Sequence, residues 1–187
     1  MKKIPTLFVG GFLPGHKVKI TNQVTPGCEW VLTGEGVATL KMDGTCTMVH
    51  GGKLFKRYDA KNGKPIPENA TPCQSEADPV TGHFPCWMPV SETDPADKWF
   101  VAAFQAAGSM EDGTYELCGP HFHRNPEKLE REIFFRHGDI VLNDVPRDFE
   151  GLRAYLKNHD LEGIVFHRGN GEMCKIKKSD FGFPWGQ

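Results

Sequence analysis

The sequence lacks three features that would place it in particular classes of protein. No stretch of its 187 residues is apolar for long enough to cross a membrane. Its first five residues lack the apolar core and the cleavage site of a signal peptide. The net charge is -2, so there is no overall positive field to hold nucleic acid. We therefore expect a cytoplasmic protein without membrane contact, in which any polyanion is held by local basic patches.

The sequence also lacks internal repeats and clustered cysteines. Hydrophobic residues make up 39% of the chain, enough for a core, and the length predicts one domain over residues 1–187. Without a secretion signal, we expect all cysteine side chains to be reduced thiols. The six cysteines are Cys28, Cys46, Cys73, Cys86, Cys118 and Cys174. Nothing in the sequence predicts an oligomeric state.

Strand patterns outnumber helix patterns along the chain, and neighbouring strands look antiparallel, so the sequence predicts an α+β fold. Residues 59–98 are polar and rich in proline, and we expect a functional surface segment or an ordered excursion there. Helices are predicted over 97–108 and over 148–157, the second capped by Asp148. Strands are predicted over 18–20, 29–32, 37–40, 45–49, 53–58, 113–120, 133–136, 139–142, 162–168 and 173–177.

The stretch Lys41-Met42-Asp43-Gly44 connects two of these predicted strands. Asp-Gly is a favoured turn, so the pattern predicts a hairpin with Lys41 near its corner. An amine held there and partly desolvated could serve as a nucleophile. The simpler alternative is an ordinary lysine on a surface hairpin.

The last two predicted strands flank Asn170-Gly171, which favours a two-residue hairpin turn. That register places Glu162, Lys175 and Lys177 on one face, and Val165 and Ile176 on the other. A carboxylate with two lysines suits a site for a metal ion and a phosphate. A surface ion pair is the alternative.

Several short motifs occur in a fixed order between residues 41 and 177. They are Lys41-Met42-Asp43-Gly44, Arg57 within Phe55-Lys56-Arg57-Tyr58, Tyr115-Glu116-Leu117-Cys118-Gly119, Glu162-Gly163-Ile164-Val165-Phe166 and Lys175-Ile176-Lys177. Together they resemble the covalent nucleotidyltransferases, which comprise ATP-dependent RNA and DNA ligases and mRNA capping enzymes. The phrases around Asp43, Glu116 and Lys177 are most similar to the small 5′-phosphate/3′-hydroxyl RNA ligases of vertebrate and phage type.

The resemblance implies catalysis through a lysyl-AMP intermediate. Lys41 would attack the α-phosphorus of ATP, and the AMP would pass to an RNA 5′-phosphate before joining to a 3′-hydroxyl. A free lysine amine has a pKa near ~10.4, and nearby cations lower it and supply the neutral nucleophile. The residues implied in catalysis are Lys41, Glu162, Lys175 and Lys177.

The resemblance also implies how ATP and Mg2+ are held. Arg57 and Glu116 would hold the ribose and the adjacent phosphate. Phe134 or Phe135 would cover the adenine, and Ile164 or Val165 would pack on its other side. The carboxylates implied for the water shell of Mg2+ are those of Asp43, Glu116 and Glu162.

The fold implied is the ATP-grasp-like catalytic core of the ligases, with two antiparallel sheets and flanking helices. The sequence ends ten residues after Lys177, which leaves no room for the OB-fold domain that usually follows in DNA ligases and capping enzymes. We therefore expect a minimal RNA ligase whose partners are RNA ends. Two basic patches could hold them: residues 53–64 with Lys53, Lys56, Arg57, Lys61 and Lys64, and residues 168–178 with Arg168, Lys175, Lys177 and Lys178.

Three alternatives remain at this point. Cys118, His121 and His123, with His83 and Cys86, have zinc-ligand types, although their spacing matches no common site. The chain could instead be a capping guanylyltransferase or a DNA ligase core. It could also be a nucleotide- or RNA-binding module without catalysis, although a decayed enzyme is expected to have lost at least one of the motif residues.

Overall fold

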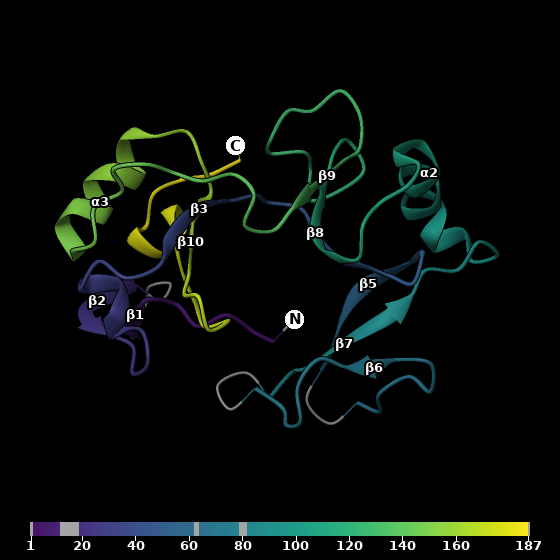
Figure 1. Cartoon of the computed structure of the whole chain (residues 1–187), viewed down its shortest axis with the longest axis horizontal. Helices are drawn as coiled ribbons and strands as arrows, with labels where there is room; N and C mark the ends of the chain where they lie inside the picture. The colour runs from purple at the N-terminus through teal and green to yellow at the C-terminus, as the bar shows by residue number, and fades with distance from the viewer. Residues whose placement is uncertain (1, 12–18, 62–63, 79–81, 187) are drawn as a thin grey trace. The chain divides into compact units, whose positions relative to one another are not determined.

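The computed structural model describes residues 2–11, 19–61, 64–78 and 82–186 (Figure 1). It has an α+β fold, as the sequence predicts. Contacts divide the chain into two compact units, the first formed by Met1–Lys3 and Asp43–His137 and the second by Ile4–Met42 and Gly138–Gln187. A single domain over 1–187 stays a prediction. No helix within the described residues has the length and apolarity needed to cross a membrane.

The first unit is built on a six-stranded sheet with the order β6-β7-β5-β4-β8-β9, in which every pair is antiparallel. Helix α2 (Lys98–Ala107) packs on one face through Phe100 and Phe104, which contact a cluster around Val49, Leu54 and Tyr115. The strands are β4 (Thr45–His50), β5 (Lys53–Ala60), β6 (Thr71–Pro72), β7 (Phe84–Pro89), β8 (Gly113–Cys118) and β9 (Ile133–Arg136), and a 3-10 turn, η1 (Pro95–Asp97), precedes α2.

The proline-rich segment 59–98 contributes two strands that the sequence pattern did not predict. Strand β7 pairs along its whole length with β5, although it contains Pro85 and Pro89. Its other neighbour, β6, pairs only with Trp87 and Cys86. Val90 N–H donates to Leu54 O, so the alternation of the antiparallel ladder turns the nitrogens of Pro85 and Pro89 away from β5. They face the side of β6, beyond its two paired residues, where a missing N–H breaks no strand pairing.

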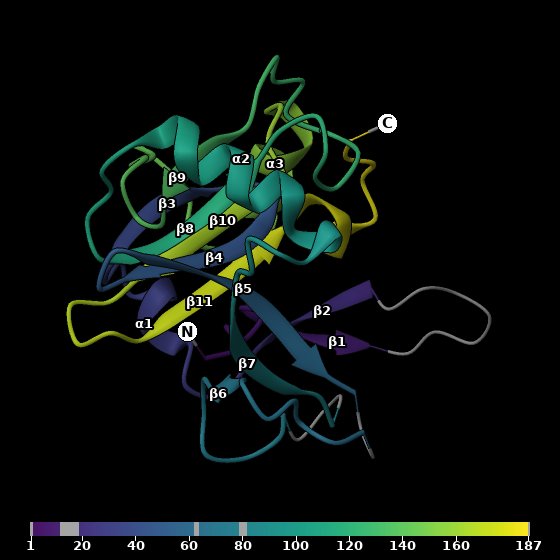
Figure 2. The same cartoon turned by 90° about the vertical axis from the view of Figure 1, so that its right-hand side faces the viewer.

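The second unit contains a three-stranded sheet with the order β11-β10-β3 and a two-stranded ribbon, β1-β2. Figure 2 shows β10 and β11 running side by side. Helix α3 (Phe149–Asn158) begins at Asp148, whose side chain accepts a hydrogen bond from the Gly151 N–H, so the predicted cap is confirmed. The other elements are β1 (Phe8–Gly11), β2 (Lys19–Val24), α1 (Glu29–Leu32), β3 (Val37–Lys41), β10 (Gly163–His167), β11 (Met173–Lys177) and a 3-10 turn, η2 (Lys178–Phe181).

The core of the second unit lies between α3, α1 and one face of the three-stranded sheet. Leu152 and Leu156 of α3 are fully buried against Ile164, Phe166 and other members of the same cluster. Counting the ribbon, the described residues form three antiparallel sheets instead of the two expected.

Two predicted strands are wrong. Residues 29–32 form the short helix α1, because Cys28 N–H closes a turn onto Thr25 O and Val31 N–H closes the next onto Cys28 O. Residues 139–142 make only an isolated bridge, between Val141 and Thr39.

The predicted hairpin around Asp43-Gly44 is also wrong, because β3 and β4 belong to different sheets. Gly44 allows a close approach between backbones and does not form a hairpin turn. A Cβ atom there would lie 2.3 Å from Leu117 O and 2.6 Å from the Cys118 sulfur, so the backbone can approach β8 only without a side chain. The motif therefore divides between the units, with Lys41 in the second and Asp43 in the first.

The final hairpin exists, but its register is shifted by one residue from the predicted one. Gly171 N–H bonds to Arg168 O, Arg168 N–H bonds to Glu172 O, and Gly171 has φ +87°. This is a three-residue loop with a left-handed glycine at its end, which adds one residue to the predicted turn. Val165 consequently pairs with Lys175, and Ile164 pairs with Ile176.

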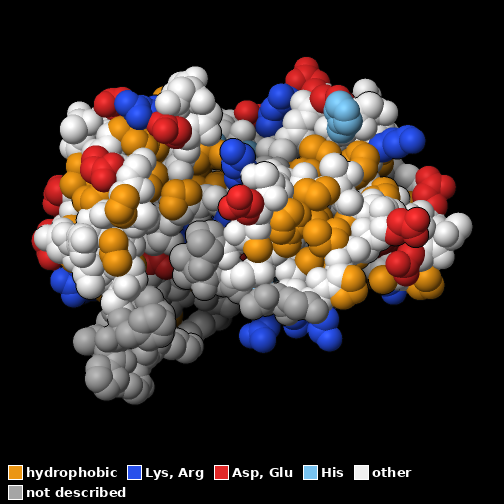
Figure 3. Space-filling model, turned by 90° about the horizontal axis from the view of Figure 1, so that it is seen from below, with side chains coloured by type: hydrophobic (Ala, Val, Ile, Leu, Met, Phe, Trp, Pro, Cys, Tyr) orange, Lys and Arg blue, Asp and Glu red, His pale blue; other side chains and the backbone are white. Residues whose placement is uncertain are grey.

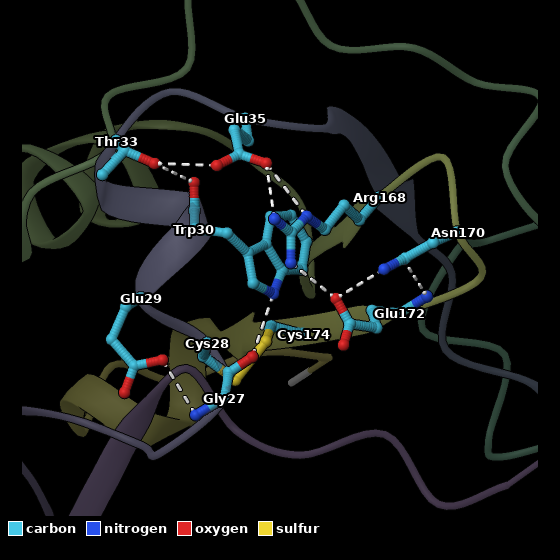
Figure 4. A network of polar contacts seen from close by, with 10 residues as sticks. All are labelled: Gly27, Cys28, Glu29, Trp30, Thr33, Glu35, Arg168, Asn170, Glu172 and Cys174. Carbon is cyan, nitrogen blue, oxygen red and sulfur yellow. Dashed lines mark hydrogen bonds and ion pairs between the residues drawn. A yellow bond between two sulfur atoms is a disulfide. The ribbon is translucent and has the colours of Figure 1, made fainter.

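A network of contacts ties this hairpin to α1 (Figure 4). The Arg168 guanidinium lies over the Trp30 ring and bonds to Glu35 and Glu172. Beneath them, Cys28 and Cys174 form a disulfide, so the expectation of six reduced thiols is wrong. It joins α1 to β11, the strand that carries Lys175 and Lys177.

Candidate active site

Lys41 is the last residue of β3 and lies directly opposite Gly163 of β10, which in turn lies opposite Lys177 of β11. Residues opposite one another across adjacent strands share a face of the sheet, so Lys41 and Lys177 do so. A Cβ atom at Gly163 would lie 2.4 Å from Ile176 O, so this position accepts no side chain. Two lysines therefore flank a glycine, about two strand spacings apart, or about 10 Å between backbones.

The carboxylate of Glu162 meets the amine of Lys41. Lys41 Nζ donates to Glu162 Oε2 at 2.5 Å and to Met42 O at 3.3 Å. The side chains are 21% and 11% exposed, respectively, so water screens this ion pair less than a pair on the surface. The Lys178 N–H donates to Glu162 O and fixes the backbone just before β10.

Lys175 lies on the same face as Lys41 and Lys177, two residues before Lys177 in β11. Burial, together with the positive charges of Lys41 and Lys177, lowers the pKa of Lys175 below its ordinary value. Three lysines thus gather on one face of a three-stranded sheet, and the carboxylate of Glu162, the residue before β10, reaches one of them. Such a face attracts a phosphate group, because its lysines repel one another until an anion binds.

The strand register distinguishes Ile164 from Val165, the two residues of β10 that the resemblance offers for packing against the adenine. Ile164 points into the hydrophobic core and is fully buried there. Val165 pairs with Lys175 and with Thr39, on the face that carries the lysines. Of the two, Val165 is therefore the residue placed beside the predicted site.

In the first unit, a row of side chains crosses one face of the six-stranded sheet. Cys46 of β4 lies opposite Glu116 of β8, and Glu116 lies opposite Phe135 of β9. Arg57 of β5 is on the same face, because its neighbour Lys56 pairs with Thr47, the residue after Cys46. Phe134 points to the other face, where its ring meets those of Phe104 and Tyr115. The register therefore favours Phe135 over Phe134 as the candidate adenine-stacking ring.

The Glu116 carboxylate is held by contacts from two directions. Its Oε1 accepts from Gly44 N–H at 3.2 Å, and its Oε2 lies 3.0 Å from His137 Nε2. Burial, followed by the negative charge of Glu116, raises the pKa of the neighbouring Cys46 thiol to about 12. The lysine motif and the central glutamate motif are thus joined directly within the first unit.

Asp43 is held by the loop between β8 and β9. Its N–H donates to Glu127 Oε1 at 3.1 Å, and its Oδ1 lies 3.2 Å from His123 Nδ1. His121, in contrast, stacks on Trp99 and pairs with Glu132. Within the described residues, the zinc-like set of Cys118, His121, His123, His83 and Cys86 forms no group of three that could hold a metal ion.

Three residues of the two predicted basic patches are held in ion pairs. Lys56 pairs with the buried Asp97, on the face opposite Arg57, and Arg168 is bound by Glu35 and Glu172. Asp59 lies 2.7 Å from Arg57 Nε. On the face in Figure 3, some Lys and Arg side chains lie near Asp and Glu, and a group at the lower edge of the view has no acidic side chain beside it. Any RNA contact therefore depends on fewer cations than the sequence suggests.

Two residues of the site escaped sequence reasoning: Cys46 and His137. Strand alternation could have found both, because His137 follows Phe135 by two residues and Cys46 follows Gly44 by two. His123 was considered from the sequence as a possible zinc ligand, and its contact with Asp43 could not be predicted because it lies in an irregular loop and has φ +47°.

The chain is distantly similar to proteins named RNA ligase 1. It is 25% identical to the rat protein (Rattus norvegicus) over 167 residues, which covers 70% of this chain and 47% of the rat protein. It is 23% identical to the zebrafish protein (Danio rerio) over 163 residues, with 69% and 46% covered. The chain thus spans about half the length of the curated relatives it matches. No protein-family model matches it.

Proposed function

We propose that this chain is an ATP-dependent RNA ligase that forms a lysyl-AMP intermediate on Lys41. The observation that carries the proposal is the Lys41–Glu162 ion pair, together with Lys175 and Lys177 on the sheet face that carries Lys41. The distant similarity to RNA ligases supports the assignment of substrate class. The proposal treats residues 1–187 as one adenylation domain with a ligase-type fold.

In the first step, the Lys41 nitrogen attacks the α-phosphorus of ATP. A nitrogen–phosphorus bond forms, the bond to the β-phosphate oxygen breaks, and pyrophosphate leaves. Lys41 is an ammonium ion while it is paired with Glu162, so its proton must depart before attack, and the Glu162 carboxylate is placed to receive it. In the following steps the AMP moves to an RNA 5′-phosphate, and a 3′-hydroxyl then displaces it.

Other residues bind the nucleotide in this proposal. Lys175 and Lys177 hold the α-phosphate and neutralise the charge that builds on it in the transition state. Arg57 and Glu116 hold the ribose and the adjacent phosphate. Phe135 stacks on the adenine, and Val165 packs against its other side.

The carboxylates of Asp43, Glu116 and Glu162 would hold Mg2+ through its water shell. Their chemistry fits, because Mg2+ prefers oxygen ligands, keeps several waters and needs few carboxylates. When bound, the ion would offset negative charge on the transferring phosphoryl group. Asp43 and Glu116 are held in place by the contacts that the loop and His137 make with them.

Intact mass spectrometry after incubation with ATP and Mg2+ tests the proposal. We expect the chain to gain the mass of one AMP, Lys41→Ala to gain none, and the exposed α3 variant Lys157→Ala to behave like the unmutated chain. Circular dichroism would confirm that the Lys41 variant is folded. Normal AMP attachment to Lys41→Ala would refute the assignment, and attachment of GMP from GTP in place of AMP would indicate a guanylyltransferase.

A further inference from the structure

The first unit brings together a thiol, a carboxylate and an imidazole from three neighbouring strands. The candidate ligand atoms of Cys46, Glu116 and His137 all lie within 4.8 Å of one another, and the three residues belong to the same unit. Cys46 and Glu116 are directly opposite one another on β4 and β8, and His137 directly follows β9. The arrangement is therefore fixed by the sheet itself.

These three ligand types together favour Zn2+ and its chemical analogues over Mg2+. Sulfur and imidazole nitrogen suit Zn2+ and Co2+, whereas Mg2+ takes oxygen ligands in octahedral geometry. With Zn–ligand bonds of about 2.0–2.3 Å, the ligand atoms of a tetrahedral site lie roughly 3.3–3.8 Å apart. Small rotations of three side chains would bring these atoms to that separation.

Two further observations fit an ion at this place. Glu116 Oε1 already accepts from Gly44 N–H, so its other oxygen is held toward His137. His137 Nδ1 is buried and has no hydrogen-bond partner among the described residues. The ring can therefore turn its Nε2 lone pair to an ion, with its proton on Nδ1, without breaking a second hydrogen bond.

We propose that Cys46, Glu116 and His137 form a binding site for one thiophilic divalent cation of the Zn2+ class. On binding, the Cys46 thiol loses its proton to solvent and a metal–sulfur bond forms, while Glu116 and neutral His137 supply an oxygen and a nitrogen. One thiolate and one carboxylate balance the charge of the ion, so the complex is neutral, as a partly buried site requires. Water completes the coordination.

The site goes beyond the proposed ligase function and has a consequence for it. An ion bound there occupies the Glu116 carboxylate, which the ligase proposal assigns to the ribose and to Mg2+. Micromolar Zn2+ should therefore compete with ATP in adenylation, and a chelator should reverse the effect.

Cobalt titration of the purified full chain tests the site, because Co2+ bound to a thiolate absorbs in the near ultraviolet. We expect one equivalent of Co2+ to produce this band and Zn2+ to displace it. Cys46→Ser should abolish the band, and His137→Gln should weaken binding at least tenfold. The matched control is Cys86→Ser, which removes a thiol from the opposite face of the same sheet and should leave the band unchanged.

A second measurement uses the unmutated chain and does not depend on variants that fold. Zn2+ should protect Cys46 from alkylation, as read by peptide mass spectrometry, and should leave the alkylation of Cys73 unchanged. Absence of the cobalt band, its persistence in Cys46→Ser, or unprotected Cys46 would overturn the proposal. These readouts need no adenylation, so loss of AMP attachment with an intact cobalt band would count against the ligase function alone.

Discussion

Lys41 and Glu162 lie 121 residues apart in the sequence, and their side chains meet at 2.5 Å because β3 and β10 are neighbours in one sheet. The backbone partner of Lys41 is Gly163, the residue after Glu162, so the strand pairing brings the segment that carries Glu162 beside the end of β3. This relationship is the basis for assigning Lys41 the role of nucleophile.

The first prediction concerns Glu162. Glu162→Gln keeps the shape of the side chain but removes its charge, so it should lower the rate of AMP attachment at saturating ATP by about 10²-fold. Single-turnover rates measured over a range of ATP concentrations would show this, with the exposed variant Glu68→Gln as control. If only the ATP concentration dependence changed, Glu162 would bind nucleotide without acting on the reacting groups.

The second prediction tests the register of the final hairpin. Ile164→Ala should lower the free energy of unfolding by about 2–5 kcal/mol, because it leaves a cavity in the core. Val165→Ala should cost less stability and should instead raise the ATP concentration needed for half-maximal adenylation. Chemical denaturation and adenylation kinetics of both variants provide the comparison. A larger loss of stability in Val165→Ala than in Ile164→Ala, with the effect on ATP dependence in Ile164→Ala, would instead support the two-residue Asn170-Gly171 turn predicted from the sequence.

The third prediction concerns acid stability around the network in Figure 4. Hydrogen bonds from Asn170 and Arg168 lower the pKa of Glu172 below its ordinary value of 4.5. A carboxylate with a depressed folded-state pKa contributes stability above its unfolded pKa and loses it as the pH falls through the folded value. Glu172→Gln should therefore have a lower Tm than the unmutated chain at pH 7, and the difference should vanish in acid once the pH falls below the depressed pKa of Glu172. A Tm difference independent of pH would contradict the charge-based explanation.

The fourth prediction concerns the nucleic acid. We expect joining of a 5′-phosphate to a 3′-hydroxyl on RNA, with weak and salt-sensitive binding, because a chain with a net charge of -2 can hold phosphates only through local groups of cations. The test compares the sealing of two labelled nicked or broken nucleic-acid substrates that differ only in whether the strand with the 3′-hydroxyl is RNA or DNA. Equal sealing of an all-DNA substrate would refute the RNA assignment and leave the lysyl-AMP chemistry standing.

Helix caps, glycine stops and amphipathic periodicity predicted the elements whose formation depends on residues close in the sequence. Helix α3 follows from Asp148 and the amphipathic residues after it, and α2 ends at Gly108, which has φ +70°. Strand β7 was missed because its two prolines argue against a strand unless their positions relative to β6 are known.

By itself, the sequence determined the α+β class, most strands, both long helices and the identity of the motif residues, because these depend on side-chain chemistry and on periods of two or 3.6 residues. Tertiary structure alone decided which residues face one another. It placed β3 and β4 in different sheets and shifted the register of the final hairpin by one residue. Because of that shift, Val165 and not Ile164 lies on the face that carries the lysines. It also joined Cys28 to Cys174 and gathered Cys46, Glu116 and His137. The physical reason is that strand pairing is set by burial of whole faces and by loop geometry, and a shift of one residue reverses every side chain.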